Sequence, residues 1–481
     1  MKMRHVITFL LLFNSGISVH AQQNWNLRTV VDYAMANNIT VKQSEVQAKV
    51  DELIYKQSKY SLIPNLTFST SASVNSGSNQ DPTNFSRITE TYLAQNLQLQ
   101  SSADIFNFFS RRNTIKANKW ELEASRANID KLKNDIALTA ANGYLEVLLA
   151  KEQENVTMIQ VNQTTAQLTN TRKLVDAGAL PELNASQLEA QLALDSVNYI
   201  TAKGNVSQAI LLLKSYMNID ASSIFEVDTP PIEAIPVEPI ADLQPDYVYK
   251  LALENQPLQR VNDFRLKAAE KNAEAVKGAM YPILSAFGSI GSGYNNQGQT
   301  ITGFTQTISP TSVQIGTVDV SGTSYNVFTQ PVISSPNFEK TGFQNQLSDN
   351  FRQSFGLNLN VPIFNGLSLR TNYQRSKLNI NTLQLQKEQD DQKLKQDIYQ
   401  AYNAAAIALE KFNASKKNVA INEITYNYAS KRFDVGMLST FDLITTQNNL
   451  LRAKLEDTIN RFDYVFKMKV LEFYKGMGLK L

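Results

Sequence analysis

The chain has 481 residues, of which 43% are hydrophobic, and its 46 basic and 44 acidic side chains leave a net charge of +2. It has no cysteine, and both of its histidines, His5 and His20, lie within the first 21 residues. Beyond that segment a basic nucleic-acid surface, disulfides, thiolate or imidazole metal sites and the corresponding catalytic groups are excluded, so we expect no enzyme, no metal and no cofactor.

Residues 1–21 are predicted to be a secretory signal peptide. Lys2 and Arg4 precede an apolar run, and Val19 and Ala21 place small residues at the positions that determine cleavage. The run is too short to cross a bilayer, which disfavours the alternative of a retained N-terminal helix. Cleavage would leave 44 basic and 44 acidic residues.

Two helices and two strands are predicted next. Apolar periodicity indicates helices over 25–37 and about 40–62, and Pro64 then stops the helical pattern. Beyond this proline apolar and polar residues alternate, which predicts strands at about 65–75 and 91–106, with a polar loop between them.

A long helical hairpin is predicted over 113–217. Apolar residues recur every seven positions up to 175, a spacing typical of helices that supercoil around neighbours. One unbroken helix here would have about 63 residues and measure about 95 Å, roughly three times the thickness of a bilayer core. Gly178 follows, a residue type that lets a helix end in a left-handed conformation, and a return helix runs to 217.

The chain then repeats its pattern. A linker over 229–245 contains five prolines and separates a first repeat, 22–228, from a second, 246–481. Pro282 corresponds to Pro64 at a shift of 218 residues, and from Ile105 onward the two halves match at a shift of 258. We therefore expect an internal duplication.

The second repeat is predicted to contain the same elements. Strands are expected at about 283–295 and 351–363, and a second long helical hairpin at 368–475. About forty additional residues lie between the strands, and we expect Tyr294 to Asn350 to form a long loop, because Ser, Thr, Gln, Asn and Gly dominate it and charges are few.

The strand that ends near Ile363 separates apolar from polar residues: Phe355, Leu357, Leu359 and Val361 alternate with Gly356, Asn358 and Asn360. This alternation fits a transmembrane barrel wall, and equally a strand pair that caps a soluble helical bundle. Because a barrel needs about eight strands, four strands per chain require an oligomer, and three copies would supply twelve.

The two predicted hairpin tips share an aspartate, a glycine and a leucine at the same spacing: Asp176, Gly178 and Leu180 in the first, and Asp434, Gly436 and Leu438 in the second. With these tips, with Pro64 and Pro282 at helix-to-strand transitions, and with the stretch RFDVGMLSTFDLITTQNNLLRAK from Arg432, the chain resembles the TolC family of outer-membrane efflux proteins. The resemblance covers essentially the whole chain after residue 21.

This resemblance implies an α+β membrane protein in the outer membrane of a Gram-negative-type bacterium. It implies a homotrimer in which four strands per chain form one transmembrane β-barrel, continued by an α-helical coiled-coil tunnel into the periplasm. It also implies that the tips, with Gly178, Leu180, Gly436 and Leu438, dock onto a periplasmic adaptor that connects the channel to an inner-membrane pump of the RND or ABC type.

The family's periplasmic gate is carried over by position. Its tyrosine and arginine fall on Phe433 and Leu438, and its two carboxylates fall on Asp442 and Thr445. Since only Asp442 keeps its type, the family's polar latch is absent and closure would depend on packing. Asp442 is expected either to stabilise the N-terminus of its helix or to form a ring of three carboxylates that attracts cations.

The predicted function is that of a duct for small molecules or other exported substrates, which the pump rather than the duct would select. The main alternative is a periplasmic trimeric coiled-coil scaffold or adhesin, which accounts for the heptads but not for the strands and their prolines. A secreted enzyme would require a catalytic pair of Asp or Glu side chains on the helices.

Overall fold

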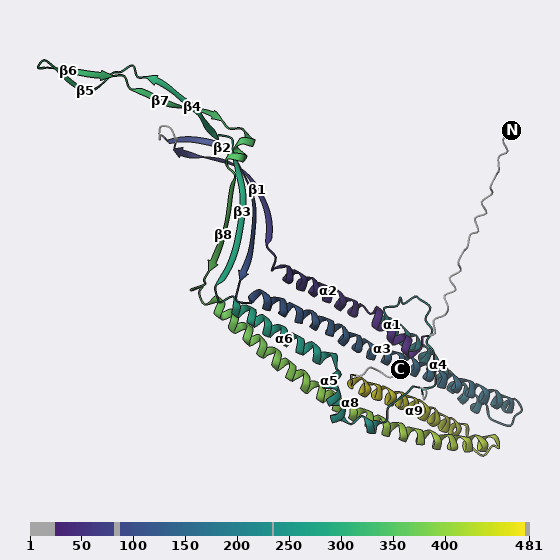
Figure 1. Cartoon of the computed structure of the whole chain (residues 1–481). Helices are drawn as coiled ribbons and strands as arrows, with labels where there is room; N and C mark the ends of the chain where they lie inside the picture. Colours follow the sequence, from purple (N-terminus) through teal and green to yellow (C-terminus); the bar gives the residue numbers. More distant parts are fainter. Residues whose placement is uncertain (1–24, 81–86, 233–234, 477–481) are drawn as a thin grey trace, which may run out of the picture. The chain divides into compact units, whose positions relative to one another are not determined.

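The computed structural model describes residues 25–80, 87–232 and 235–476 (Figure 1). The predicted signal peptide, residues 1–21, lies outside these ranges. The chain divides into two compact units, which are described separately. The helical unit comprises the residues up to Leu53, Lys119–Ala268 and from Ile380 onward, and the strand unit comprises Ile54–Asn118 and Ala269–Asn379. Among the described residues no helix combines the length and apolar character needed to cross a membrane.

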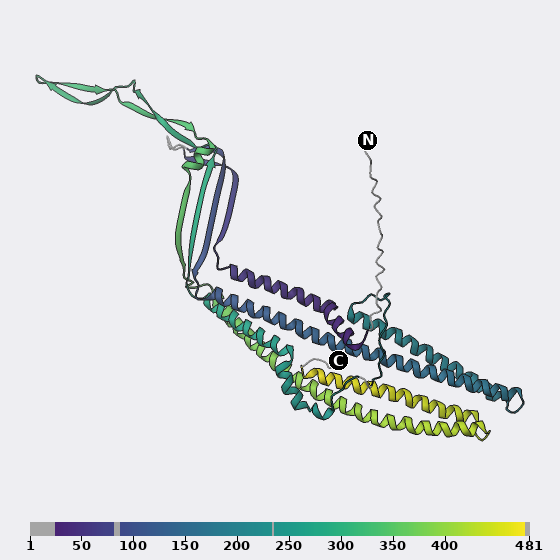
Figure 2. The ribbon, with the colours of Figure 1, turned by 45° about the vertical axis from the view of Figure 1, so that its right-hand side comes forward.

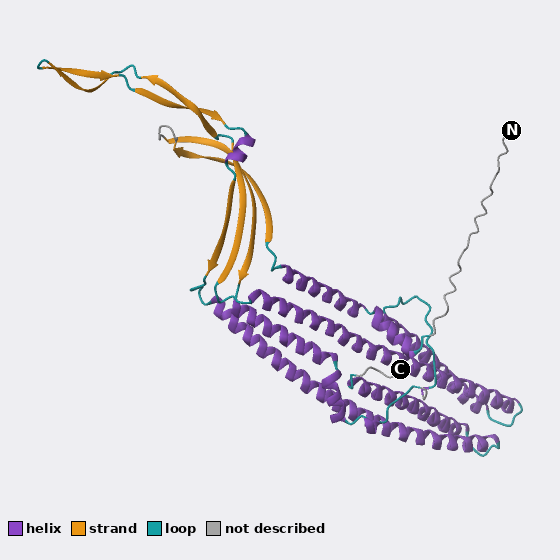
Figure 3. Ribbon diagram, viewed as in Figure 1, coloured by secondary structure: helices purple, strands orange, loops and turns teal. Residues whose placement is uncertain are grey.

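Among the described residues, eight α-helices lie wholly or partly in the helical unit: α1 (Leu27–Asn37), α2 (Ile39–Tyr60), α3 (Ser110–Asp176), α4 (Glu182–Met217), α5 (Pro245–Asn255), α6 (Pro257–Gly278), α8 (Ser368–Asp434) and α9 (Thr440–Tyr474). Helices α3 and α8 have 67 residues each, which corresponds to about 100 Å at the α-helical rise. Figure 3 shows that α3 with α4, and α8 with α9, form two helical hairpins.

The main apolar core lies where α1, α3, α4 and the linker meet. Its fully buried members include Val30, Ala140, Val147 and Leu213, each with 0% of its surface exposed. A second cluster joins the linker to α5, α8 and α9 through Leu243, Val248, Ile398, Met468 and Leu471. The linker is therefore fixed against the helices at both of its ends.

Two side chains of α3 attach the start of the linker by hydrogen bonds. The hydroxyl of Tyr144 donates to the carbonyl oxygen of Asp228 at 2.7 Å, and Nζ of Lys151 donates to the carbonyl oxygen of Val227 at 3.0 Å. Burial raises the pKa of Tyr144 to about 12, and the nearby Asp228 carboxylate adds to the shift.

The strand unit contains a four-stranded antiparallel sheet in the order β1-β2-β3-β8. Its strands are β1 (Asn65–Gln80), β2 (Arg87–Phe106), β3 (Ile283–Asn295) and β8 (Arg352–Asn360). Pro64 directly precedes β1 and Pro282 directly precedes β3, so each proline stands where the chain changes from helix to strand. The polar loop expected between the first two strands is shorter than predicted, because the alternation continues to Gln80 and resumes at Arg87.

The prediction of a long loop over Tyr294 to Asn350 is wrong. The segment forms two β-ribbons, in which β4 (Gln299–Ile308) pairs with β7 (Val332–Lys340) and β5 (Val313–Val320) pairs with β6 (Thr323–Thr329), followed by the short helix α7 (Phe343–Asp349). Thr, Val, Ile and aromatic residues favour strands even where the composition is polar. Ser321 and Gly322 both have positive φ, 50° and 87°, as a two-residue hairpin turn requires.

Candidate channel wall and gate

The sheet has one apolar and one polar face, because paired residues of neighbouring strands point to the same side. One face carries Leu66, Phe68, Val74, Leu97, Leu99, Ile290, Phe355, Leu357 and Leu359. The other carries Thr67, Ser69, Ser71, Asn96, Gln98, Gln100, Ser289, Ser354 and Asn358. Along β1 the apolar residues extend from Leu66 to Val74, close to the length of about nine to eleven residues with which a tilted strand crosses a bilayer.

The polar face is lined mainly by amide and hydroxyl groups. The charged residues that its described part carries are Glu90, Asp104 and Arg352. It is also hollowed, with a depression of about 570 Å³ lined by Ser71, Asn96, Gln98, Ser289 and Ser354 among others. Such a surface can contact water and solutes of either charge without strong selection.

Two glycines let aromatic rings lie flat on the sheet. A Cβ atom at Gly288 would approach the ring of Phe355 to 3.0 Å, and one at Gly356 would approach the ring of Phe287 to 2.8 Å. Phe355 lies on the apolar face, whereas Phe287 lies on the polar face. Phe287 therefore places an aromatic ring among the polar side chains.

The two hairpin tips have the same backbone structure. Gly178 and Gly436 adopt φ of +70° and +73°. The residue after each glycine donates a backbone hydrogen bond of 2.8 Å to the carbonyl oxygen five positions earlier, from Ala179 to Leu174 and from Met437 to Arg432. This is a Schellman motif, and an added Cβ would be strained at either glycine.

The first tip is braced by an ion-pair cluster. The guanidinium of Arg172, in the last turns of α3, contacts Glu182 and Glu189 at the start of α4. Its hydrogen bonds to Glu189 and then to Glu182 raise the pKa of Arg172. The predicted docking residue Leu180 lies half-buried between the two helices.

At the second tip, Asp442 is hydrogen-bonded to Ser439, the N-cap residue of α9. The hydroxyl of Ser439 accepts a hydrogen bond from the Asp442 backbone N–H at 3.1 Å and donates to the Asp442 carboxylate at 2.7 Å. The carboxylate is exposed in the first turn of α9, where it stabilises the positive end of the helix dipole. Asp442 therefore stabilises the start of α9 while its carboxylate remains exposed to solvent.

The other three residues carried over from the family's gate lie at the second tip and at the start of α9. Phe433 and Leu438 are half-buried at the end of α8 and in the tip, and Thr445 is exposed on α9. The hydroxyl of Thr445 donates to the carbonyl oxygen of Phe441 within its own helix at 2.8 Å. The Thr445 hydroxyl is therefore bonded within its own helix rather than to the first tip.

The polar contacts between the hairpins lie farther from the tips, at residues that the sequence did not single out. Gln191 of α4 and Asn448 of α9 exchange two hydrogen bonds of 3.1 and 3.2 Å. Nε2 of Gln447 donates to the hydroxyl of Thr164 at 3.0 Å, and that hydroxyl donates to the carboxylate of Asp195 at 2.6 Å. The Asp195 carboxylate also accepts from Gln191 at 2.8 Å, so one buried network joins both hairpins.

Tyr426 makes a second contact between the hairpins. Its hydroxyl accepts hydrogen bonds from the side-chain amides of Gln163 and Gln167 on α3. Burial raises the pKa of Tyr426, while the two donated hydrogen bonds act in the opposite direction. Tyr426 lies within the second predicted helical hairpin, but nothing local in the sequence identifies its two glutamine partners.

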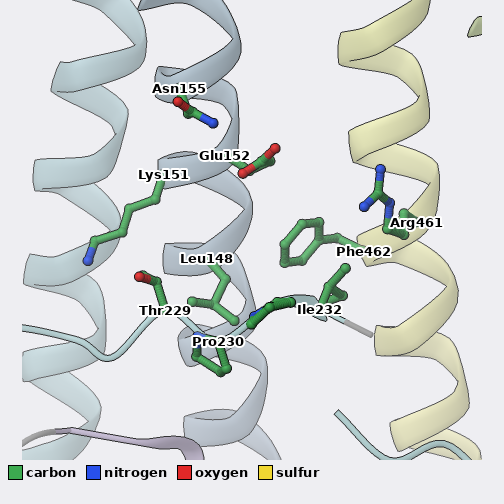
Figure 4. Close-up of a pocket in the computed structure, with 10 residues that line it drawn as sticks. Leu148, Lys151, Glu152, Asn155, Thr229, Pro230, Ile232, Arg461 and Phe462 are labelled. Atoms are coloured by element: carbon green, nitrogen blue, oxygen red, sulfur yellow. The ribbon is translucent and has the colours of Figure 1, made fainter. Parts of the chain in front are cut away.

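A pocket of about 480 Å³ lies between α3, α9 and the linker (Figure 4). Leu148, Pro230, Ile232 and Phe462 supply its apolar side, and Glu152 and Asn155 lie on the neighbouring turns of α3. Arg461 is held by Asp457 at 3.0 Å. The described residues contain no group of three or more Asp, Glu, His or Cys side chains that could hold a metal ion.

Comparison with known proteins identifies relatives of this architecture. A sequence profile of the family described as outer membrane efflux protein matches residues 30–218 and 248–458. The outer membrane efflux protein BepC of Brucella suis is 19% identical over 454 residues, which cover 94% of this chain and 85% of BepC. The toluene efflux pump outer membrane protein TtgC of Pseudomonas putida is 21% identical over 472 residues, which cover 95% and 85% of the two chains.

Solved structures give the same fold. The CmeC outer membrane channel of Campylobacter jejuni superimposes with a TM-score of 0.70 at 18% sequence identity, covering 94% of this chain and 86% of CmeC. None of these relatives supports the alternative of a scaffold or adhesin, and all are named as channels or efflux proteins rather than enzymes.

Proposed function

Because this chain belongs to the outer membrane efflux protein family, we propose that three copies of it form the outer-membrane duct of a tripartite efflux or export system. The protein lies in the outer membrane of a Gram-negative-type bacterium and its helices extend into the periplasm. The sheet is the main support for a trimeric duct. One of its faces is apolar and the other is polar and hollowed, and its two outer strands have edges that are unpaired among the described residues.

The unpaired edges require a partner in a membrane. Strands β1 and β8 end the sheet on either side, and each exposes backbone N–H and C=O groups that lipid cannot satisfy. If β1 of one copy pairs with β8 of the next, three copies close a barrel of twelve strands. The apolar face then meets lipid, and the polar face lines the lumen.

The lumen chemistry supports a broad range of substrates. Amide and hydroxyl side chains dominate the polar face, so the wall offers weak hydrogen bonds and little fixed charge. We assign small molecules as the transported class and leave the selection to an inner-membrane pump of the RND or ABC type.

The two internal repeats predicted from the sequence fit this assembly, because the same order of helices and strands occurs twice, apart from the ribbons.

The tips are the proposed docking sites for a periplasmic adaptor. Gly178 and Gly436 reverse the chain, with Leu180 and Leu438 beside them, and large apolar side chains are exposed around both turns: Leu183, Val435, Met437 and Phe441, each 64–70% exposed. Apolar groups this exposed favour a protein partner. Crosslinking in cells from Ala179→Cys or Met437→Cys should capture the adaptor, since the chain has no other cysteine.

Asp442 is the proposed cation-sensitive residue of the periplasmic opening. In a trimer three exposed carboxylates at the second tip would attract multivalent cations. Asp442→Asn should relieve block of conductance by such cations and lower the free energy of unfolding by about 0.5 kcal/mol through the weakened helix cap. Thr445→Ala, one turn further on, is the matched control and should leave the block unchanged. Equal block in wild type and Asp442→Asn would contradict this assignment.

The duct is tested by deletion and reconstitution. Cells without the protein should lose export or resistance, and expression of the full chain should restore it. The purified protein should migrate as a trimer that dissociates on heating and should conduct ions in planar bilayers without hydrolytic activity. Extraction from cells without detergent, together with absence of conductance, would favour a periplasmic scaffold instead.

A further inference from the structure

The first ribbon, β4 with β7, has one mainly apolar and one mainly polar face. Its register places Ile301 opposite Phe338, Phe304 opposite Pro336 and Ile308 opposite Val332 on one side, together with one polar pair, Gln306 and Ser334. The opposite side pairs Thr300 with Glu339, Gly303 with Asn337, Thr305 with Ser335 and Thr307 with Ile333. The large apolar side chains are open to solvent in a single chain, with Phe304 at 63% and Ile308 at 61% exposure.

The second ribbon, β5 with β6, has the same character. Its apolar side carries Val313, Val318, Val320, Tyr325 and Val327, while its other side carries Gln314, Thr317, Asp319, Ser324, Asn326 and Phe328. Val318 is 48% exposed and Tyr325 is 57% exposed. The insertion is thus two amphipathic ribbons in series rather than a polar loop with scattered apolar residues.

An isolated two-stranded ribbon of this kind is marginally stable in water and needs cover for its apolar face. The low charge of this segment limits what can bind its apolar face. Residues 299–340 contain three charged side chains, Asp319, Glu339 and Lys340. A surface of anionic lipid headgroups would call for clustered Lys or Arg, and a charged protein partner would call for opposite charges. An identical ribbon fits this composition, since it offers an apolar face of the same kind, and the net charge of each copy over 299–340 is only −1, from Asp319 and Glu339 against Lys340.

The topology brings copies of the ribbon together. Strand β3 begins directly after α6 and ends at Asn295, so the ribbons leave the sheet at the end opposite its helices (Figure 2). In a closed barrel every copy would place its ribbons around the same external opening. Copies that are held together in this way have a high effective concentration for one another, so that even a modest apolar contact can persist.

We propose that the apolar faces of the two ribbons are covered by the ribbons of the other copies of this chain, forming a three-fold β-structured collar at the external opening. This inference rests on the trimeric duct proposed above. The collar lies outside the lipid-facing band of the sheet, so trimer formation by the barrel does not depend on it.

Single cysteines in the full chain test the collar, because the protein has no cysteine of its own. Ile308→Cys and Val318→Cys place a thiol on the apolar faces, and Thr307→Cys and Thr317→Cys place one on the polar faces of the same strands. Each purified trimer is treated with a membrane-impermeant maleimide and, separately, with a mild oxidant. The collar predicts labelling about tenfold slower at the two apolar positions than at their polar neighbours. It also predicts a disulfide-linked pair of chains from at least one apolar position and from neither polar control.

Equal labelling of apolar and polar positions in the purified trimer would overturn the collar. Protection in intact outer membranes that disappears in the purified trimer would overturn it as well and would assign the cover to lipid or to another protein. A variant in which a short turn replaces residues 299–340 separates this proposal from the duct itself. That variant should remain a heat-dissociable, conducting trimer, and loss of trimer in the unaltered chain would refute the duct rather than the collar.

Discussion

Helices α3 and α4 are held together by different chemistry at their two ends. Near the linker the buried side chains are apolar, as at Ala140, Val147 and Leu213. Toward the tips, apolar Ala185 and Leu188 of α4 are also buried, but most of the buried side chains are polar: Thr157, Gln160, Thr164, Thr171, Gln191 and Asp195, joined on α9 by Gln447. Separating the helices in the apolar half exposes apolar surface to water, which costs about 25 cal/mol of free energy per Å². Separating the polar half exchanges protein hydrogen bonds for bonds to water, at a net cost of about 1 kcal/mol each.

We expect the tip half of this pair of helices to rearrange more readily than the linker half. If the tips open and close as the proposed duct requires, contacts that are specific in one arrangement yet inexpensive to hydrate suit them. The linker half carries the main buried apolar contacts. The two halves should therefore respond differently to substitution.

The largest effect is expected in the linker half. Leu213→Ala removes a fully buried side chain from the apolar core and should lower the free energy of unfolding by about 3 kcal/mol, because a cavity remains. Guanidinium unfolding of the purified protein, followed by circular dichroism, measures the change. Leu211→Ala makes the same substitution at a side chain that is 49% exposed and should cost clearly less. Equal costs would mean that the linker half has no dominant core.

A smaller effect is expected at the attachment of the linker. Tyr144→Phe removes the hydroxyl that donates to the Asp228 carbonyl oxygen and should cost about 1–2 kcal/mol, because that carbonyl then lacks a partner.

Tyr144 should also make the free energy of unfolding depend on pH. Since burial raises the pKa of Tyr144 to about 12, the folded protein keeps a proton that the unfolded chain loses near pH 10. The stabilisation is complete below pH 10 and declines as the pH rises toward 12. Unfolding measured at pH 9, 10 and 11 should show a shallower decline in Tyr144→Phe, and an unchanged slope would contradict the assignment.

The smallest global effect is expected in the tip half. Asp195→Asn replaces an acceptor oxygen with a donor facing Thr164 or Gln191, but it also removes a buried charge, so the free energy of unfolding should change by about 1 kcal/mol or less. Hydrogen exchange should instead increase locally around 157–171 and 185–195. Asp176→Asn, an exposed aspartate at the same end, is the control. Increased exchange that extends to residues 140–150 would remove the distinction between the halves.

The sequence predicted those parts of the fold that have local signals. Pro64 and Pro282 mark the change from helix to strand, and Gly178 and Gly436 end helices with positive φ, because each residue type is restricted or permitted by its own backbone geometry. The ribbons were missed because a segment rich in Ser and Thr has the composition of a loop. Its alternation and the turn at Ser321 and Gly322 indicate strands when examined position by position.

The polar network could not be predicted in this way. The seven-residue apolar repeat is buried at Ala140 and Val147, but toward the tip Val161, Leu168 and Val175 are only half-buried, whereas Thr164 and Thr171 beside them are covered. Burial at the tip half depends on which neighbouring helix covers each position. Gln191 and Asn448 are 257 residues apart, and only the folded chain brings them together.

The most direct test of the duct uses the two faces of β8. Leu357→Cys and Asn358→Cys place a thiol on adjacent residues that point to the apolar and polar faces. A charged methanethiosulfonate reagent added to the protein in a planar bilayer should reduce or alter conductance of Asn358→Cys and leave that of Leu357→Cys and the cysteine-free chain unchanged. A response of Leu357→Cys alone, or of neither variant in a conducting protein, would contradict a lumen lined by the polar face of this sheet.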